Sequence, residues 1–425
     1  MLAQNSFVRI EGGGMEDFQL NRRDFLGKTI AGVAITAASY RQVLGANDRL
    51  RVANIGCGGR GLLKEALQVK DRTNAAVVAV CDSWRQRVEE ATKAVQDAGG
   101  PAPKQFVHYQ DVLALKDVDA VIIGTPDHQH CTILKAAAEA GKDAYVEKPL
   151  AMTMKELKAA VSAVKKNQRI VQVGTQVRSW PAPTAAAAFI KSGGLGKILK
   201  IEQSRNSYKP YWHAYASRQL TQADVDWKAF LMNVKYRPFD ADQYAGWYGY
   251  REFSRGPHTN LFVHFIDLVH YFSGAEYPKR GMTMGGIYRW KDKRTCPDSV
   301  ETVMEYPEHG FLARYCTVFG NGGNSYMKVI GTRGILDITN WRGEIKLTGE
   351  GSGEPDKIGP NVTIPITETE HHMADFFNCA RSRKQPLAPI DAGYGHAIAT
   401  LIADESFVRG RRMVYDTGKK EVVPG

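Results

Sequence analysis

Apolar and polar positions follow one another from residue 50 onward in a pattern that predicts strands and helices in turn. The strand-like runs are short and apolar, and they cover residues 50–55, 76–81, 106–109, 120–124, 144–146 and 170–173. Between them the apolar positions recur at helical spacing, most clearly at 62–69 and 131–140. Strands that alternate with helices predict an α/β fold with a doubly wound parallel sheet, whose ligands lie at the carboxyl ends of the strands.

The first strand-like run is followed by a glycine-rich turn. The turn reads GCGGRG over residues 56–61 and leads into the helical pattern at 62–69. Gly56 permits the tight turn, Gly58 lets the backbone approach a pyrophosphate, and Gly61 allows close packing of helix on strand. The sequence therefore predicts a dinucleotide site, with a turn that binds nothing as the alternative. We expect the cofactor to be contacted here by Gly56, Gly58, Gly59, Arg60 and Gly61.

An acid follows the second strand-like run at the distance expected of a ribose ligand. Asp82 stands 21 residues after Gly61, and a carboxylate at that position accepts a hydrogen bond from the ribose 2′-hydroxyl. The same charge repels the 2′-phosphate of NADP. We therefore expect NAD, and NADP stays open because Arg60 and Arg85 are near in the sequence.

Composition and charge narrow the classes of function. The chain has 425 residues, 43% of them hydrophobic and 24% charged, which fits a folded protein of two domains behind a short leader. The net charge of +11 comes from basic residues scattered through both halves, without a basic run interleaved with stacking aromatics. We expect no nucleic-acid partner, because a cofactor pyrophosphate or another anion fits a positive balance equally well.

Neither the cysteines nor the histidines show the spacing of a metal site. The six cysteines lie far apart and form no CxxC pair. His128 and His130 form a close pair, but no third ligand of suitable spacing accompanies them. We predict no metal and no disulfide framework.

A twin-arginine segment precedes the body of the chain. Residues 21–28 read NRRDFLGK and lead into a mildly apolar stretch of small residues at 29–39. This arrangement resembles a Tat export signal, with cleavage between Ala37 and Ala46. The stretch is too short to span a bilayer, so we predict a periplasmic or otherwise exported protein without a stable membrane span. A chance arginine pair before a short helix is the alternative, and Met15 is a second candidate start.

Two polar motifs that follow strand-like runs complete a resemblance to a known family. TPDHQH occupies residues 125–130 and EKP occupies residues 147–149, so both motifs are expected at the same edge of the sheet. Together with GCGGRG and a helix that carries His264, they resemble the Gfo/Idh/MocA oxidoreductases over nearly all of the chain after the leader. The resemblance implies an N-terminal Rossmann domain and a C-terminal α/β domain with an open, mostly antiparallel sheet.

The resemblance also implies a division of the chain and a class of substrate. We expect a leader at 1–46, an NAD(P)-binding Rossmann domain at 47–175, and a domain for substrate binding and oligomerisation at 176–425. The C-terminal helices of the last domain can pack back on the Rossmann domain. A sugar or cyclitol substrate and a homo-oligomer are implied by analogy with the family and not by interface residues.

Lys148 of the EKP motif is implied to lie between nicotinamide and substrate and to assist the movement of the hydroxyl proton. A lysine that faces a partly desolvated cleft can exchange protons near neutrality, which supports the same role independently. A surface lysine before a proline turn is the alternative. The residues that the resemblance places on the nicotinamide side are Thr125, Pro126, His130, Glu147, Lys148 and Gln176.

The helix that carries His264 resembles the family pattern Asp-x-Gly-x-His-x-x-Asp but departs from it at two positions. It reads NLFVHFID over residues 260–267, with Asn260 in place of aspartate and Phe262 in place of glycine. Asn260, His264 and Asp267 follow i, i+4, i+7 spacing and are predicted to share one face. We expect His264 to be a general base and Asn260 a catalytic residue that binds the substrate hydroxyl without sharing charge with His264. A core histidine satisfied by Asp267 is the alternative.

Aromatic side chains are dense between residues 204 and 255. Such side chains suit sugar rings, and they also fill cores and interfaces, so few of them are assigned to the substrate. The residues expected to contact substrate are Arg178, Tyr208, Trp212 and Asp267.

These observations predict an exported NAD(P)-dependent oxidoreductase that transfers a hydride between nicotinamide and a hydroxyl-bearing carbon of a sugar, glycoside or cyclitol. One alternative is a redox-neutral NAD-dependent glycosidase, although the Thr-His-Gly-Leu-Gly-Pro-like segment of the glycosidase subgroup is not found in the sequence. The other is a non-catalytic dinucleotide- or sugar-binding protein, which the exchange of aspartate for Asn260 makes credible.

Overall fold

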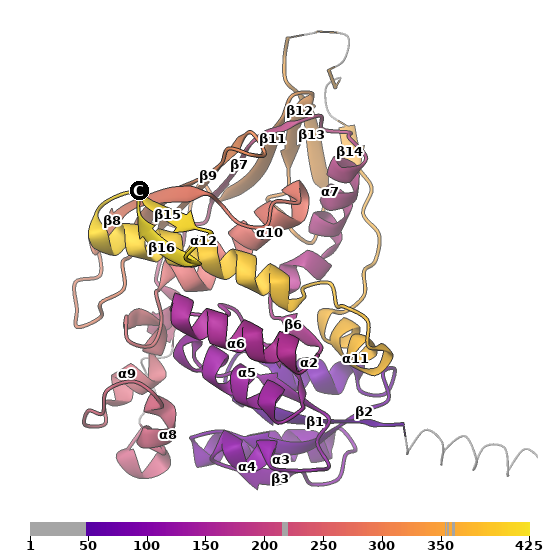
Figure 1. Cartoon of the computed structure of the whole chain (residues 1–425), viewed down its shortest axis with the longest axis vertical. Coiled ribbons are helices and arrows are strands. Elements are labelled where there is room, and N and C mark those ends of the chain that lie inside the picture. Colours follow the sequence, from indigo (N-terminus) through magenta and orange to yellow (C-terminus); the bar gives the residue numbers. More distant parts are fainter. Residues whose placement is uncertain (1–47, 215–219, 353, 355–356, 359–361) are drawn as a thin grey trace, which may run out of the picture. The chain divides into compact units, whose positions relative to one another are not determined.

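Six parallel strands form the first sheet, in the order β3-β2-β1-β4-β5-β6 (Figure 1). This is the order of a doubly wound Rossmann sheet, so the predicted parallel sheet is confirmed. The computed structural model describes residues 48–214, 220–352, 354, 357–358 and 362–425. The strands are β1 (Leu50–Ile55), β2 (Ala75–Cys81), β3 (Lys104–Phe106), β4 (Ala120–Ile123), β5 (Asp143–Val146) and β6 (Val171–Val173).

Helices cover both faces of this sheet because its strands are apolar on both sides. In β4, Ala120 and Ile122 face one core, whereas Val121 and Ile123 face the other. One core contains residues of α2 (Leu62–Val69), α3 (Arg85–Asp97) and α11 (His372–Ser382). The other contains residues of α4 (Tyr109–Leu113), α5 (His130–Glu139) and α6 (Met154–Lys166). A helix from near the end of the chain, α11, thus completes the packing of the N-terminal sheet.

A ten-stranded second sheet follows in the order β14-β13-β12-β11-β7-β10-β9-β8-β15-β16. Its neighbours pair antiparallel, except that β7 and β10 run parallel. The predicted C-terminal α/β domain with a mostly antiparallel sheet is therefore confirmed. Its strands are β7 (Ile198–Ser204), β8 (Arg280–Gly286), β9 (Ser299–Tyr306), β10 (Phe311–Val318), β11 (Tyr326–Gly331), β12 (Gly334–Asp337), β13 (Ile345–Gly349), β14 (Val362–Ile364), β15 (Met413–Asp416) and β16 (Glu421–Pro424).

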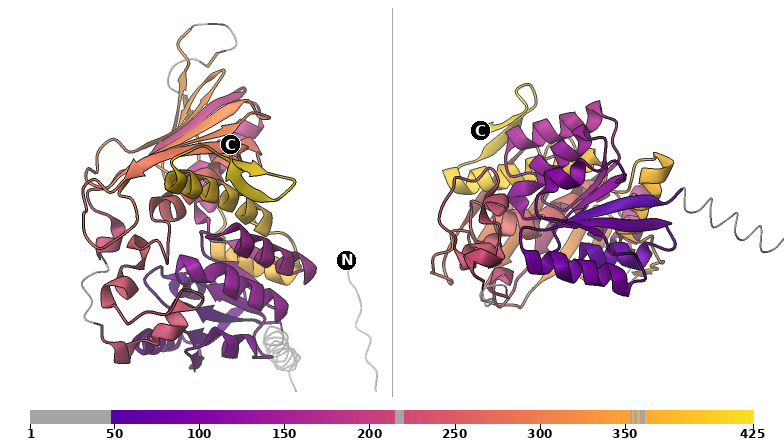
Figure 2. Two further views of the ribbon diagram at one scale, coloured as in Figure 1. Left: turned by 60° about the vertical axis from the view of Figure 1, so that its left-hand side comes forward. Right: turned by 90° about the horizontal axis from the view of Figure 1, so that it is seen from below.

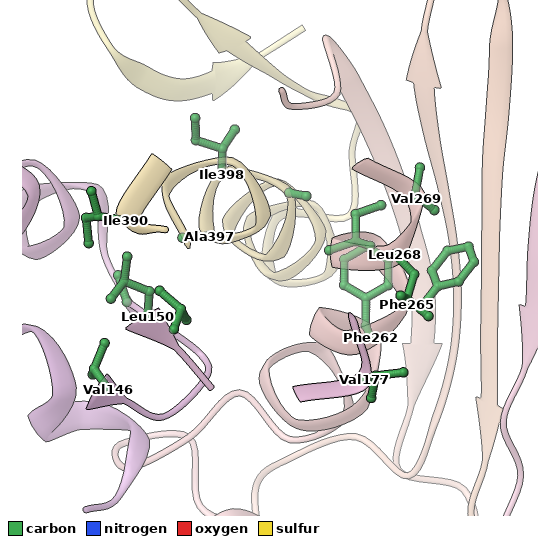
Figure 3. Packing of buried hydrophobic residues seen from close by; sticks show 14 of the residues in the cluster. Val146, Leu150, Val177, Phe262, Phe265, Leu268, Val269, Ile390, Ala397 and Ile398 are labelled. Atoms are coloured by element: carbon green, nitrogen blue, oxygen red, sulfur yellow. The ribbon is translucent and has the colours of Figure 1, made fainter. Parts of the chain in front are cut away.

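Helix α12 (Ile390–Arg409) lies between the two sheets (Figure 2). It packs against α6 and β6 on one side and against α10 (Val263–Ser273) and β8 on the other. Figure 3 shows side chains of α12 between Val146 and Leu150 on one side and Phe262 and Leu268 on the other. Because α12 is apolar around most of its circumference, it can bury itself against both layers at once.

Short helices fill the stretch between β7 and α10. They are η3 (Tyr211–Ala214), η4 (Gln222–Asp224), α8 (Trp227–Leu231), α9 (Ala241–Ala245), η5 (Trp247–Gly249) and η6 (His258–Phe262), whereas α7 (Pro181–Lys191) precedes β7. Many of the aromatics in this stretch pack on one another, as Trp227 stacks on Phe230 with ring centroids 5.1 Å apart. Most of the aromatic density seen in the sequence is therefore a local core.

Residues 50–425 form one compact unit. The twin-arginine segment and the whole predicted leader lie outside the described residues. Within the described residues, no helix combines the length and the apolar character needed to cross a bilayer.

Candidate active site

A cleft of about 470 Å³ opens at the carboxyl ends of the first sheet's strands, as expected of an open α/β sheet. Its other wall is formed by the stretch from Asp226 to Asn260. Eleven of the predicted site residues line it: Gly56, Gly58, Gly59, Arg60, Asp82, Thr125, Pro126, His130, Glu147, Lys148 and Asn260. The two polar motifs and the glycine turn are thus brought to one place.

The glycine turn is held in a conformation that larger residues could not adopt. Gly56 has φ +90°, and a Cβ built on it would lie 2.6 Å from the Gly124 backbone at the end of β4. Gly61 has φ +77° and precedes α2, but a Cβ there would meet nothing within 4 Å. The expected reason for Gly61, close packing of helix on strand, is therefore wrong, and its left-handed backbone is the reason instead.

Asp82 anchors the turn as well as facing the cleft. Its Oδ2 accepts a hydrogen bond from the Cys57 backbone N–H at 2.8 Å, and its Oδ1 accepts one from the Trp84 N–H at 3.0 Å. Each carboxylate oxygen keeps a lone pair for a ribose hydroxyl, so the site fits NAD. Burial raises the pKa of Asp82, while the Arg87 guanidinium, 4.0 Å away, opposes that rise.

The basic residue beside Asp82 is Arg87, which the sequence did not single out. Arg85 is exposed on α3, whereas Arg87 lines the cleft and lies over the ring of Trp84 at 5.0 Å and that of Tyr244 at 5.6 Å. Its place two residues after Arg85 in the same helix was the only signal in the sequence. Arg87, and not Arg85, is therefore the arginine that lies beside Asp82 in the cleft.

Arg60 lies toward the other end of the cleft and ties the glycine turn to the EKP motif. Its Nε is 2.8 Å from Glu147 Oε1, and its Nη1 donates to Glu65 at 2.7 Å. The Gln176 side chain, oriented so that both amide atoms are satisfied, accepts from Arg60 Nη2 at 3.1 Å and donates to the Gly174 carbonyl. Gln176 does not line the cleft, and its role is to hydrogen-bond the Arg60 guanidinium.

The TPDHQH motif forms a short 3₁₀ turn, η1 (Asp127–Gln129), and the start of α5. The two ring nitrogens of His130 lie 2.7 and 2.8 Å from the carbonyl oxygens of Pro149 and Thr125. His130 therefore braces the loop after β4 against the loop after β5. The His128 ring and the Gln129 amide both contact the carbonyl oxygen of Phe230, at 2.8 and 2.6 Å.

No cluster of metal ligands is present among the described residues, and the imidazoles of this motif are engaged with carbonyl oxygens.

Lys148 reaches across the cleft from the first sheet to the second domain. The side chain is half-buried, and Nζ donates a hydrogen bond to the Asn260 carbonyl oxygen at 3.1 Å. Burial lowers the pKa of Lys148 from its ordinary 10.5, while the charge of Asp127 opposes that effect. A lysine so placed can take up and release a proton more readily than a solvated one.

Asn260 lies in a π-helical turn, η6, that precedes α10. Its amide Nδ2 donates to Ser254 Oγ at 2.8 Å and to the Gly256 carbonyl at 3.2 Å. Such widened turns often occur at functional sites. Asn260 lies in the π turn, whereas His264 and Asp267 lie in α10, so the common face expected from regular helical spacing stays a prediction.

His264 is buried, and its Nδ1 has no hydrogen-bond partner among the described residues. Burial lowers the pKa of His264 well below 6.5, and the positive charge of Lys148 lowers it further, so the ring is neutral. It does not line the cleft. Its expected role as general base stays a prediction, and Asp267 does not satisfy it, because that carboxylate is bound elsewhere.

The four residues expected to contact substrate do not line the cleft. Arg178 and Asp267 are paired with each other, with Nε 2.6 Å from Oδ2 and Nη2 2.9 Å from Oδ1. Trp212 is almost fully buried, and Tyr208 is 66% exposed. The aromatic rings that do line the cleft are Phe230, Tyr244, Trp247 and Tyr248, together with Tyr109.

Another residue that the sequence analysis did not single out is Asp127. It belongs to TPDHQH, is 3% exposed, and lines the cleft. Its signal in the sequence is a carboxylate shortly after an apolar strand, next to the two histidines of the same motif.

Two family models match the chain. One, described as an oxidoreductase family with an NAD-binding Rossmann fold, matches residues 50–175. The other, described as the C-terminal alpha/beta domain of an oxidoreductase family, matches residues 187–407. Together they cover the first sheet, the second sheet except β15 and β16, and the residues that line the cleft.

Three individual proteins that resemble the chain share 20% to 28% sequence identity with it. A scyllo-inositol 2-dehydrogenase (NAD(+)) of Bacillus subtilis is 28% identical over 381 residues, which is 87% of this chain and 97% of that protein. A glycosyl hydrolase family 109 protein of Shewanella pealeana is 27% identical over 194 residues, and the match spans only 42% of its length and 41% of this chain. A solved levoglucosan dehydrogenase in complex with NADH and levoglucosan has a TM-score of 0.66 at 20% identity, covering 86% of this chain and 98% of its own. The likeness to this solved structure shows the fold of the chain.

Proposed function

The chain belongs to the Gfo/Idh/MocA oxidoreductase family and carries its NAD-binding Rossmann fold, and from this membership we propose that it interconverts an alcohol and a ketone on a sugar, glycoside or cyclitol. The observation that carries the proposal is the meeting of three motifs in one cleft: the glycine turn, Lys148 of EKP, and the π turn with Asn260. The relatives named as dehydrogenases of scyllo-inositol and levoglucosan support this class of substrate.

When bound, NAD⁺ accepts the hydride from the carbinol carbon. The protein must remove the hydroxyl proton at the same time, because the carbon–oxygen double bond forms only as both hydrogens leave. Lys148 is placed for this step, because its Nζ is hydrogen-bonded to the Asn260 carbonyl oxygen in the cleft and because burial favours its neutral amine. The neutral amine takes the proton and becomes an ammonium group, which then returns the proton to solvent.

The remaining residues of the cleft hold the cofactor and shape the site. Asp82 fixes the glycine turn and offers oxygen atoms to the ribose. Arg60 and Glu147 connect that turn to the loop that carries Lys148. The aromatic wall around Trp247 and Tyr248 suits the apolar face of a sugar ring. Asn260 offers polar atoms to hydroxyl groups.

A redox-neutral glycosidase is the second candidate, and the match to glycosyl hydrolase family 109 favours it. In such an enzyme, transient oxidation acidifies a neighbouring C–H bond, so that elimination and addition of water replace direct hydrolysis and the cofactor ends unchanged. The match spans less than half of that relative, and the same cleft residues would serve both reactions.

Product mass spectrometry separates these candidates. The purified protein is incubated with NAD and a panel of sugars, glycosides and cyclitols, and separately with NADP. A product lighter by two hydrogens together with one equivalent of NADH supports the dehydrogenase, and a cleaved glycoside without NADH supports the glycosidase. Bound cofactor with no product from any member of the panel would count against both and would indicate a binding protein.

We further propose export by the Tat pathway. The twin arginines at 22–23 and the small-residue stretch after them support this. Export in the folded state would let the Rossmann domain bind NAD before it leaves the cytoplasm. Fusion of residues 1–46 to a reporter tests the idea: Lys substitution of both arginines should retain the reporter inside the cell, and unchanged export would exclude this route.

Self-association through the second sheet is also proposed. The outward positions of β8, β9 and β10 carry exposed apolar side chains, namely Met282, Met284, Val303, Leu312 and Val318. A second copy of the chain would cover this surface without exposing new apolar area. Sedimentation of the wild type and of Leu312→Asp tests it, because the variant should shift toward monomer.

A further inference from the structure

Asp127 is a buried carboxylate at the centre of the cleft, contributed by the first domain. It is 3% exposed and lines the cleft together with Lys148 and Asn260. An unpaired buried carboxylate is costly, so a residue of this kind needs partners that offset the loss of hydration.

Those partners come from the second domain. Asp127 Oδ2 accepts a hydrogen bond from Ser254 Oγ at 2.8 Å and a longer one from Asn260 Nδ2 at 3.5 Å. Ser254 Oγ in turn accepts from Asn260 Nδ2 at 2.8 Å. The Asp127 carboxylate is therefore joined to the Asn260 amide both directly and through the Ser254 hydroxyl. Position 260 is the one at which the family pattern has an aspartate.

The same carboxylate is coupled to Lys148. The charge of Asp127 is the strongest of those that stabilise the Lys148 ammonium, ahead of Glu147, whereas Arg60 and Arg205 act against it. In the other direction, Lys148 and then His130 stabilise the Asp127 carboxylate against its burial. Among the described residues no direct hydrogen bond joins the two side chains; Lys148 Nζ binds the Asn260 carbonyl instead.

Three other titratable groups close to this pair are neutral. His264 is kept neutral by burial and by Lys148. Burial and the charge of Asp127 raise the pKa of the Tyr211 hydroxyl far above 10, and burial raises that of the Cys296 thiol above 9. None of these groups can supply the negative charge that Asn260 lacks.

We propose that Asp127 supplies to this site a negative charge that Asn260 cannot supply: it stabilises the ammonium group that forms when Lys148 accepts the hydroxyl proton, and it orients Asn260 through Ser254. The proposal rests on the proposed dehydrogenase function. In the balanced step, the substrate C–H bond releases a hydride to NAD⁺, the O–H bond releases its proton to the Lys148 amine, and the ketone remains. Asp127 stays ionised throughout and acts as a positioning residue.

The first test reads Lys148 directly and needs no substrate. Competitive acetylation of the full chain with acetic anhydride over a range of pH, in the presence of NAD, gives the midpoint at which Lys148 loses its proton, by peptide mass spectrometry. Asp127→Asn should move that midpoint to lower pH by about one unit, because removal of the negative charge leaves the ammonium less stabilised. Asp127→Glu, which keeps the charge, should leave it near the wild-type value.

A matched control distinguishes this effect from a general loss of structure. Asp404 is also buried, but it pairs with Arg251, Arg255 and His258 and does not act on Lys148. Asp404→Asn should lower stability without moving the Lys148 midpoint. Asp127→Ser is a second neutral variant that keeps a hydrogen-bonding group for Ser254 and serves if the asparagine variant does not fold. An unmoved midpoint in a folded neutral variant overturns the proposal.

The second test uses turnover. The acid limb of kcat/KM for alcohol oxidation should shift to lower pH in Asp127→Asn, and the plateau should fall about tenfold or more because the base is weaker. If the wild type oxidises no substrate, the proposed dehydrogenase function fails while the acetylation result still stands. If turnover is normal and neither the midpoint nor the acid limb moves, the role of Asp127 alone is excluded.

Discussion

Two groups of polar side chains join the first sheet to the second domain, and they differ in whether their charged groups are paired with each other. The cleft cluster, Asp127, Lys148 and Asn260, lines the cleft, and its two charges are not directly paired. The junction cluster, Arg178, Asp267 and His396, is closed: both carboxylate oxygens are bound by Arg178, and His396 Nδ1 lies 3.3 Å from one of them.

The electrostatics of the two clusters differ accordingly. Direct pairing with Arg178 and His396 lowers the pKa of Asp267 despite its burial, whereas burial dominates at Asp127 and raises its pKa. A carboxylate with its partners in place holds structure together. A carboxylate and a lysine that are hydrogen-bonded to neutral groups, without a directly paired counter-ion, can respond to a reacting hydroxyl group. Substitutions in the two clusters should therefore damage different properties.

The largest expected effect is on turnover in the cleft cluster. Lys148→Met should lower kcat by about 10³-fold, which is about 4 kcal/mol in the barrier, because the group that takes the proton is gone. NAD affinity and the thermal midpoint should stay close to those of the wild type. Steady-state kinetics and thermal unfolding check both, with Lys135→Met on the exposed side of α5 as the control.

If Lys148→Met turned over substrate at the wild-type rate, Lys148 would not be the proton acceptor, and His264 would become the leading candidate.

The next effect is on stability, in the junction cluster. Asp267→Asn should lower the free energy of unfolding by about 3 kcal/mol, since it leaves the buried Arg178 guanidinium without its anion. Urea unfolding measures the loss, and kcat of the protein that remains folded should change little. The double variant Arg178→Met/Asp267→Leu should recover much of the stability, because it removes both charges. No recovery would mean that the pair contributes more than mutual neutralisation.

A third effect concerns pH, through a histidine near the junction cluster. Burial lowers the pKa of His372 to about 4, and its ring contacts Ser179 Oγ at 2.8 Å and the Val173 carbonyl at 3.0 Å. The unfolded chain takes up the proton near pH 6.5 and the folded chain does so only near pH 4, so stability is lost as pH falls through this window. Between pH 7.5 and 5 the loss from this residue is about 2 kcal/mol.

Urea unfolding of the wild type and of His372→Gln at pH 7.5, 6 and 5 measures the difference. The difference in the free energy of unfolding between the two proteins should change by about 2 kcal/mol between pH 7.5 and 5, and it should level off below pH 4. A difference that is constant with pH would mean that His372 has the same pKa in the folded and the unfolded chain.

The smallest effect is on cofactor affinity, at the edge of the cleft. Asp82→Asn should weaken NAD binding about tenfold, which is about 1.4 kcal/mol, by removing a charged acceptor for the ribose. It should weaken NADP binding less, because Arg87 would no longer be opposed by a carboxylate. Calorimetric titration with both nucleotides checks the ratio, and Asp97→Asn on the exposed end of α3 is the control. An unchanged NAD/NADP ratio would show that Asp82 serves only the turn.

Much of the architecture could be predicted because its signals are local. Strand-length apolar runs separated by helical spacing are enough to specify the parallel sheet and its two cores, as β1, β2 and β4 show. The glycine turn is equally local, since Gly56 and Gly61 adopt backbone conformations that the sequence pattern requires. Motifs that directly follow strands, such as TPDHQH and EKP, had to meet at one edge of that sheet.

The partners of individual side chains could not be read in this way. Arg178 and Asp267 are 89 residues apart and looked like substrate ligands, yet each is the other's counter-ion. The spacing of Asn260, His264 and Asp267 suggested one regular helix, but Asn260 lies in a π turn and the other two lie in the α-helix that follows. No periodicity in the sequence marks a π turn, because the preference arises from the packing around it.

The sequence by itself thus determined the order of the elements, the cofactor turn and the edge at which the site forms, because these depend on neighbouring residues and on the 3.6- and 2-residue periods of helix and strand. Only the tertiary structure decided which charges are paired and which face the cleft. That outcome depends on distances between segments far apart in the chain, and it turns a carboxylate from the first domain, Asp127, into the neighbour of Lys148 and Asn260.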